Sequence, residues 1–215
     1  MESDIALQNV NTLNQYVDGL SIEAEYKQLL LTAAKGFVEN RRMGLQLIDI
    51  TEPKEKDEFL DLRYEQMQSV KDVERQLQQK GVSVNFLAHA QELAMAPLKE
   101  EIIGGLVDAR VDNINLTHRF YDEPEVESKE GLLVNVFESH DRYKNLQRKA
   151  TYLGVTQEEI RERENESLEP FRKSIVDEAL EIKSLTDPAS VNRLKILKIR
   201  LKRLGALEDQ LKSLE

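Results

Sequence analysis

Histidine is the side chain whose ordinary pKa lies nearest neutrality, so the three histidines of this chain are the first residues to test for chemistry. A di-iron helical bundle requires a Glu three residues before a His on facing helices. The residues three positions before His89, His118 and His140 are Phe86, Asn115 and Phe137, and none of them is Glu. The chain also lacks an HExxH motif and contains no Cys, which excludes mixed His and Cys zinc sites. We therefore expect no metal and no cofactor.

Two of the histidines have neighbours that suggest a role. His140 lies on an apolar stripe beside Phe137 and Tyr143, and this pattern predicts a buried, hydrogen-bonded core histidine in preference to a ligand or general base. His118 is followed one turn later by Asp122, which would be placed to orient or charge the ring. The alternative for that pair is a surface contact of less than about 1 kcal/mol.

Carboxylates are the other candidates for acid–base chemistry or for binding a hard metal ion. The chain has 40 acidic residues, and with that number helix-spaced pairs arise unavoidably. No carboxylate pair is singled out by its neighbours, and no GxSxG, P-loop or GxGxxG motif occurs. The sequence therefore predicts no catalytic residue, and we expect a protein that is not an enzyme.

The composition favours helices throughout. Charged residues make up 33% of the 215-residue chain, with 9 Gly, 5 Pro and no Trp, whereas an all-β protein would need more turn-forming and aromatic residues. No apolar run approaches the roughly 20 residues of a membrane-spanning helix. The first residues, Met1 to Asp4, lack the basic and apolar segments of a secretory signal. Together with the absence of Cys, this predicts a soluble cytoplasmic protein.

Apolar residues recur at steps of three or four along most of the chain, which predicts an all-α protein with about seven helices, as a bundle or a more elongated arrangement. The breaks between helices are expected near Gly19, at Pro53, at Gly81, in the acidic segment 122–130, at Gly154 and at Asp187–Pro188. Thr156 and Glu159 form a capping-box pattern, flanked by Val155 and Ile160 as a hydrophobic staple. Pro97 and Pro170 are expected to kink or break their helices.

Two of the predicted helices have stripes that we expect to be buried. The first stripe, in the helix after Pro53, contains Leu60, Tyr64, Met67, Val70, Val73 and Leu77. The second, in the helix before Gly154, contains Leu133, Val136, His140, Tyr143, Gln147 and Ala150. The segment 122–130 between the two regions is acidic and contains Pro124, so residues 1–121 and 131–215 form two candidate helical regions. The sequence leaves open whether the segment separates two domains or joins two helices of one bundle.

The C-terminal helix has the most unusual charge in the chain. Six basic residues and no acidic residue lie between positions 193 and 203, whereas the remaining chain has 24 basic against 40 acidic residues, or −16. Leu194, Leu197, Leu201, Leu204 and Leu211 follow a heptad-like spacing, which Glu208 interrupts. This pattern is typical of a coiled-coil-like helix at the lower limit of length.

Three interpretations of the C-terminal helix remain. It is a core helix whose basic flanks pair with acidic neighbours, or a helix that associates with another copy or another protein. The third is a contact with nucleic acid or an anionic membrane. We expect a scaffold or assembly component that binds a protein partner or itself, with a nucleic-acid-associated accessory factor as the alternative. The predicted partner-binding residues are Arg193, Leu194, Lys195, Leu197, Lys198, Arg200, Leu201, Lys202, Arg203 and Leu204.

Overall fold

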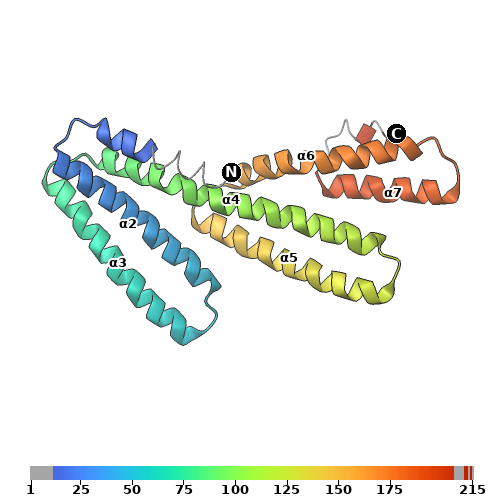
Figure 1. Cartoon of the computed structure of the whole chain (residues 1–215), viewed down its shortest axis with the longest axis horizontal. Coiled ribbons are helices and arrows are strands. Elements are labelled where there is room, and N and C mark those ends of the chain that lie inside the picture. The colour runs from blue at the N-terminus through green and yellow to red at the C-terminus, as the bar shows by residue number, and fades with distance from the viewer. Residues whose placement is uncertain (1–11, 206–210, 213, 215) are drawn as a thin grey trace. The chain divides into compact units, whose positions relative to one another are not determined.

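The computed structural model describes residues 12–205, 211, 212 and 214, and every regular element among them is an α-helix. Residues 12–18 are helical, and six longer helices follow (Figure 1). These are α2 (Ala24–Asp49), α3 (Pro53–Gln79), α4 (Val84–Asp122), α5 (Val126–Tyr152), α6 (Gln157–Ile182) and α7 (Pro188–Arg203). The all-α, multi-helix prediction is therefore confirmed. Residues 4–11 of the first predicted helix, and Glu208 in the last, lie outside the described residues.

Two helices end at glycines, as the sequence predicts. Gly81 and Gly154 have φ values of 78° and 73°, a left-handed conformation that glycine adopts without a steric penalty. After α3, the Val82 N–H donates to the Leu77 carbonyl at 3.0 Å, and after α5 the Val155 N–H donates to the Ala150 carbonyl at 3.0 Å. This pattern, the Schellman motif, satisfies carbonyls that the helix end leaves unpaired.

The helix starts also agree with local signals. Pro53 occupies the first turn of α3, where its missing N–H costs no hydrogen bond. At α7 the Asp187 carboxylate accepts from the Ser190 N–H at 3.0 Å, with Pro188 in the first turn. Val155 and Ile160, the predicted staple around the start of α6, are both buried. These ends follow from local sequence because the capping partners lie within a few residues of each other.

Neither internal proline ends its helix. Pro97 lies inside α4, and Pro170 lies inside α6. The expectation of a break at either proline is therefore wrong. Each proline removes one intrahelical hydrogen bond. Tertiary packing of the residues before and after the proline stabilises the helix, so it continues past this position. Near Pro170 the side chain of Arg172 donates to the Asn165 carbonyl at 2.6 Å, one turn before the proline.

The chain forms two compact units that are discontinuous in sequence. Unit 1 comprises residues 1–106 and 137–156, and unit 2 comprises residues 107–136 and 157–215. Helices α4 and α5 each contribute to both units. The acidic segment 122–130 contains only a three-residue connection, residues 123–125, between the end of α4 and the start of α5. A division at that segment stays a prediction. The compact units have boundaries within α4 and within α5, and a third in the connection before α6.

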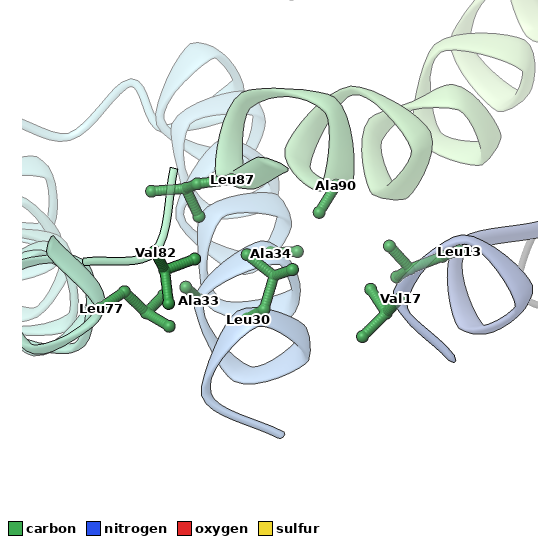
Figure 2. Packing of buried hydrophobic residues seen from close by; sticks show 9 residues of the cluster. All are labelled: Leu13, Val17, Leu30, Ala33, Ala34, Leu77, Val82, Leu87 and Ala90. Atoms are coloured by element: carbon green, nitrogen blue, oxygen red, sulfur yellow. The ribbon is translucent and has the colours of Figure 1, made fainter. Parts of the chain in front are cut away.

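Unit 1 has a core where residues 12–18 and helices α2, α3 and α4 contribute small and medium-sized apolar side chains (Figure 2). The buried members are Leu13, Val17, Leu30, Ala33, Ala34, Leu77, Val82, Leu87 and Ala90. Alanines at the centre of this cluster let neighbouring helices approach closely. Each fully buried leucine or valine contributes about 1.5–3 kcal/mol relative to leaving it exposed.

The α2–α3 pair of unit 1 uses only part of the predicted stripe of α3, since Val70 and Leu77 are buried as predicted. Leu60 and Tyr64, expected in the core, are exposed. The face of α3 toward α2 instead presents Arg63, whose guanidinium donates to the Asn40 side chain at 3.3 Å, and Gln66, which donates to the Gly36 carbonyl at 2.7 Å. The prediction for Leu60 and Tyr64 failed because these side chains lie on a side of α3 that α2 does not cover.

Unit 2 has a second core, formed mainly by α6 and α7, with Ile114 from α4. Its buried members are Ile114, Leu168, Ile175, Ala179, Leu197, Leu201, Leu204 and Leu214. Helices α6 and α7 lie side by side (Figure 1). This pair positions the basic residues of the C-terminal helix.

Candidate interaction surface

The leucine seam of α7 lies in the core of unit 2. Leu197 and Leu201 are fully buried, Leu204 is nearly so, and Leu194 is partly buried against the same cluster. Their partners in α6 are Leu168, Ile175 and Ala179, which belong to the same buried apolar cluster. The seam is therefore occupied within the chain, and these leucines offer no exposed surface to a second molecule.

Two of the six basic residues are also engaged within unit 2. The Arg200 guanidinium donates to both carboxylate oxygens of Asp122, at 2.7 and 3.3 Å. Arg193 donates to the same carboxylate at 3.0 Å and to Glu178 at 2.7 Å. We call this set, Asp122, Glu178, Arg193 and Arg200, the carboxylate clamp. It joins the end of α4 to α6 and α7.

The clamp shifts the protonation equilibria of its members. The hydrogen bond from Arg200 is the largest effect on Asp122 and, with the bond from Arg193, it lowers the pKa of that carboxyl below its ordinary 3.8, although burial acts in the opposite direction. The hydrogen bond to Glu178 is the main cause that raises the pKa of Arg193. Both shifts favour the charged forms of Asp122 and Arg193.

A third arginine closes the other end of α7. Arg172 of α6 is buried and donates to the carbonyl of Leu204, the C-cap residue of α7, at 3.0 Å. It also forms an ion pair with Glu169 at 2.9 Å. A cation at a helix C-terminus interacts favourably with the unpaired carbonyls and with the helix dipole. Arg172 therefore fixes where α7 ends against α6.

The remaining basic residues lie on the side of α7 that faces solvent. Lys195, Lys202 and Arg203 are exposed, and Lys198 is half-buried. In the part of the chain that the structure describes, none of these four forms an ion pair. Three aliphatic side chains are exposed among them. We call the set Val191, Lys195, Ile196, Ile199, Lys202 and Arg203 the outer face of α7.

The outer face of α7 is the part of the predicted site that remains accessible. Ile199 is 53% exposed although it lies only two residues from the fully buried Leu201. Lys195, Lys202 and Arg203 come from the sequence prediction, whereas Val191, Ile196 and Ile199 were missed. The sequence does contain a signal for these three residues, because apolar residues fall on two different sides of α7. The leucines and the isoleucines of α7 form separate stripes.

Helix α5 also has an exposed apolar stripe that the sequence prediction missed. The face of α5 that is more covered contains Leu132, Val136 and the buried Ser139. The Asn113 side chain of α4 donates to the Val136 carbonyl at 3.0 Å. Leu133 was predicted to be buried, but 39% of it is exposed, and Val134 and Phe137 are more exposed still. The predicted stripe agrees with the covered face at Val136 and at the buried Ala150, whereas Leu133 and His140 lie one residue away from that face, a rotation of about 100°.

The same rotation of α5 explains why the prediction for His140 was wrong. His140 is exposed, so the interpretation as a core histidine is wrong. His118 is half-buried, and burial, followed by the positive charge of Arg200, lowers its pKa below 6.5 despite the opposing effect of Asp122. Because Asp122 is held by two arginines, it does not charge the His118 ring at neutral pH. His89 packs edge-on against Tyr16, with ring centroids 4.6 Å apart.

Unit 1 contains a polar cluster around Tyr152 that the sequence did not indicate. The Tyr152 hydroxyl accepts from Arg63 at 2.6 Å, and the guanidinium groups of Arg41 and Arg63 lie 5.5 and 5.7 Å from the ring centroid. Gly44 of α2 lies directly against this ring, leaving no room for a larger residue. The cluster joins α2, α3 and the end of α5, and every member that we name has a structural contact to account for it.

Among the described residues, no group of three or more His, Asp or Glu side chains is placed to hold a metal ion. None of the described helices is both long and apolar enough to cross a membrane. No protein-family model, curated protein or solved structure matches the chain.

Proposed function

We propose that this chain is a non-enzymatic helical protein that binds protein partners through the outer face of α7, as a scaffold or assembly component. The observation that carries the proposal is the side-by-side exposure of Val191, Ile196 and Ile199 with three cations that have no ion-pair partner among the described residues. Apolar contact supplies affinity in protein recognition, and flanking charge selects the partner and its orientation. The absence of Cys in the chain is consistent with action in the cytoplasm.

The alternative is a nucleic-acid-associated accessory factor that binds through the same cations. Three observations favour a protein partner instead. Arg193 and Arg200 are committed to carboxylates within the chain. The outer face has no aromatic residue on which a base could stack. Its aliphatic side chains would also gain nothing from a phosphate backbone. A titration with labelled DNA and RNA at two salt concentrations tests the alternative, because phosphate contacts weaken steeply as salt rises.

The proposal is tested by placing a photo-crosslinking amino acid at position 199 and, as a control, at the exposed Lys71 of α3. Each protein is irradiated in an extract of the cells that carry it. We expect a protein adduct of defined mass from position 199 that position 71 does not give. The Lys195→Glu/Lys202→Glu variant should lose the adduct, because it reverses the charge that selects the partner. Equal adducts from both positions, or adducts that contain nucleic acid, would contradict the proposal.

A further inference from the structure

Unit 2 carries two exposed helix faces with opposite charge. We propose that the outer face of α7 in one copy of the chain binds the outer face of α5 in a second copy. The outer face of α5 consists of Val126, Glu127, Glu130, Leu133 and Val134. This inference rests on the proposed function and names the partner that the surface accepts.

The outer face of α5 is unusually apolar for a surface helix. Val126 is 73% exposed and Val134 is 55% exposed, with the exposed Leu133 beside them. Single exposed apolar residues need no explanation, but a contiguous line of them marks an interaction surface. Phe137 continues the line on the next turn of the same helix and is also exposed. The line is flanked by Glu127 and Glu130, which have no ion-pair partner among the described residues.

The two faces match in length as well as in charge. From Val126 to Val134 is eight residues, and from Val191 to Ile199 is also eight residues, so each line is about 12 Å long. Packing the lines against each other would bury aliphatic side chains on both sides. It would also bring Lys195 and Lys202 toward Glu127 and Glu130. Opposite charges that flank an apolar helix seam are what sets partner and orientation in paired helices.

A second copy fits these observations better than a membrane. An amphipathic helix that lies in a lipid surface needs a wide apolar face to insert. The wide apolar face of α7, with Leu197, Leu201 and Leu204, is already occupied in the core. The outer face has three aliphatic residues interleaved with cations, which is narrow enough for a helix seam. Its acidic counterpart on α5 would be repelled by anionic lipids.

A charge-swap experiment on the full chain tests the inference. One variant carries Lys195→Glu/Lys202→Glu, and a second carries Glu127→Lys/Glu130→Lys. The control, Lys56→Glu/Lys71→Glu, changes the net charge as the first variant does but alters two exposed residues of α3. The mass of each protein is measured by light scattering up to about 100 µM, because one helix pair is a small interface and we expect weak association.

We expect the wild type and the α3 control to exceed the 24.8 kDa of a single chain. Each swap variant alone should weaken association at least tenfold, because like charges then face each other, about 1.4 kcal/mol or more. An equimolar mixture of the two variants should associate again, because each supplies the charge that the other lacks. Circular dichroism confirms that all variants keep their helices.

Four results would overturn the inference. A wild type that stays at the mass of one chain at the highest concentration excludes self-association. Swap variants that assemble like the wild type show that another surface is used, and a mixture that does not recover association shows that the two faces do not meet. These results leave the crosslinking test of the proposed function independent, because a foreign protein captured at position 199 would still support that function. Vesicles with anionic lipids that bind the wild type but not Lys195→Glu/Lys202→Glu would also overturn the inference.

Discussion

The helix pairs α2–α3 in unit 1 and α6–α7 in unit 2 use different side chains to bring their helices together. In α2–α3 the contacts combine the apolar Val70 and Leu77 of α3 with small or polar positions of α2, including Gly36 and the buried Asn40. In α6–α7 they are leucines, with Arg193, Arg200 and Arg172 binding carboxylates or carbonyls at the ends of the seam. Each pair also buries polar atoms that have no hydrogen-bond partner among the described residues, Arg63 Nε and Gln66 Oε1 in α3 and Arg200 Nε in α7. The α2–α3 pair depends more on close approach at Gly36, and the α6–α7 pair depends more on apolar burial.

The difference determines what each pair leaves exposed. Because the leucines of α7 face α6, the opposite stripe of aliphatic and basic residues has no cover within the described structure. In the α2–α3 pair, Arg63 and Gln66 of α3 bond to α2, and the apolar Leu60 and Tyr64 remain on the outside of α3. In both pairs the exposed stripe follows from which face the neighbouring helix selects. The stripe of α7 also carries basic residues, and it is the surface through which we propose that the chain binds a partner.

The largest expected effect is the loss of a leucine from the α6–α7 seam. Leu201→Ala removes a fully buried side chain and should lower the free energy of unfolding of unit 2 by about 2–5 kcal/mol. Hydrogen exchange, read separately for peptides of units 1 and 2, measures this. Ile199→Ala is the matched control, and we expect a change within about 0.5 kcal/mol because that side chain is exposed. Equal effects of the two substitutions would show that the seam does not depend on burial.

A glycine substitution tests the close approach in unit 1. Gly44→Ala places a methyl group against the Tyr152 ring, so the ring must move and its bond to Arg63 is lost. We expect unit 1 to lose about 1–3 kcal/mol in thermal or urea unfolding. Gly104→Ala is the control, because Gly104 is an exposed helical glycine with nothing within 4 Å of the added carbon. There we expect a gain of about 0.5–1 kcal/mol, and a loss at both sites would argue against close packing as the cause.

The smallest expected effect is the pH dependence of the carboxylate clamp. The pKa of Asp122 is lowered in the folded state, so the clamp stabilises unit 2 above the ordinary pKa near 3.8 and this contribution is lost as pH falls through the lowered value. Asp122→Asn should therefore weaken unit 2 at pH 7 and narrow the difference in its stability between pH 7 and pH 3. Because Asp122 is partly exposed, solvent screening keeps the effect small.

Unit 1 offers a matched variant for that experiment. Burial raises the pKa of Asp49, but the hydrogen bonds from Lys149 and Asn145 outweigh burial and lower it overall. Asp49→Asn should change the acid response of unit 1 and leave unit 2 unaltered. Equal changes in the acid response of both units after either substitution would show that the two ion-pair clusters do not act locally. That result would contradict the distinction between the two units.

The amino-acid sequence by itself determined where the helices begin and end. The starts at Pro53 and Asp187–Pro188, and the ends at Gly81 and Gly154, follow from caps and backbone preferences that involve only a few neighbouring residues. The two internal prolines were the exception. There local preference predicted a kink or a break, and only the break is excluded, because α4 and α6 continue through Pro97 and Pro170.

Only the tertiary structure decided which side of each helix is covered. Leu132 and Leu133 are adjacent in sequence and chemically identical, yet they point about 100° apart, and only Leu133 lies on the exposed side. In α7 the sequence offered two apolar stripes, and the contacts with α6 buried the leucines and left Ile196 and Ile199 outside. Periodicity shows that a helix has an apolar side. Which side is buried depends on the neighbouring helices, because burial is a property of the contact between them.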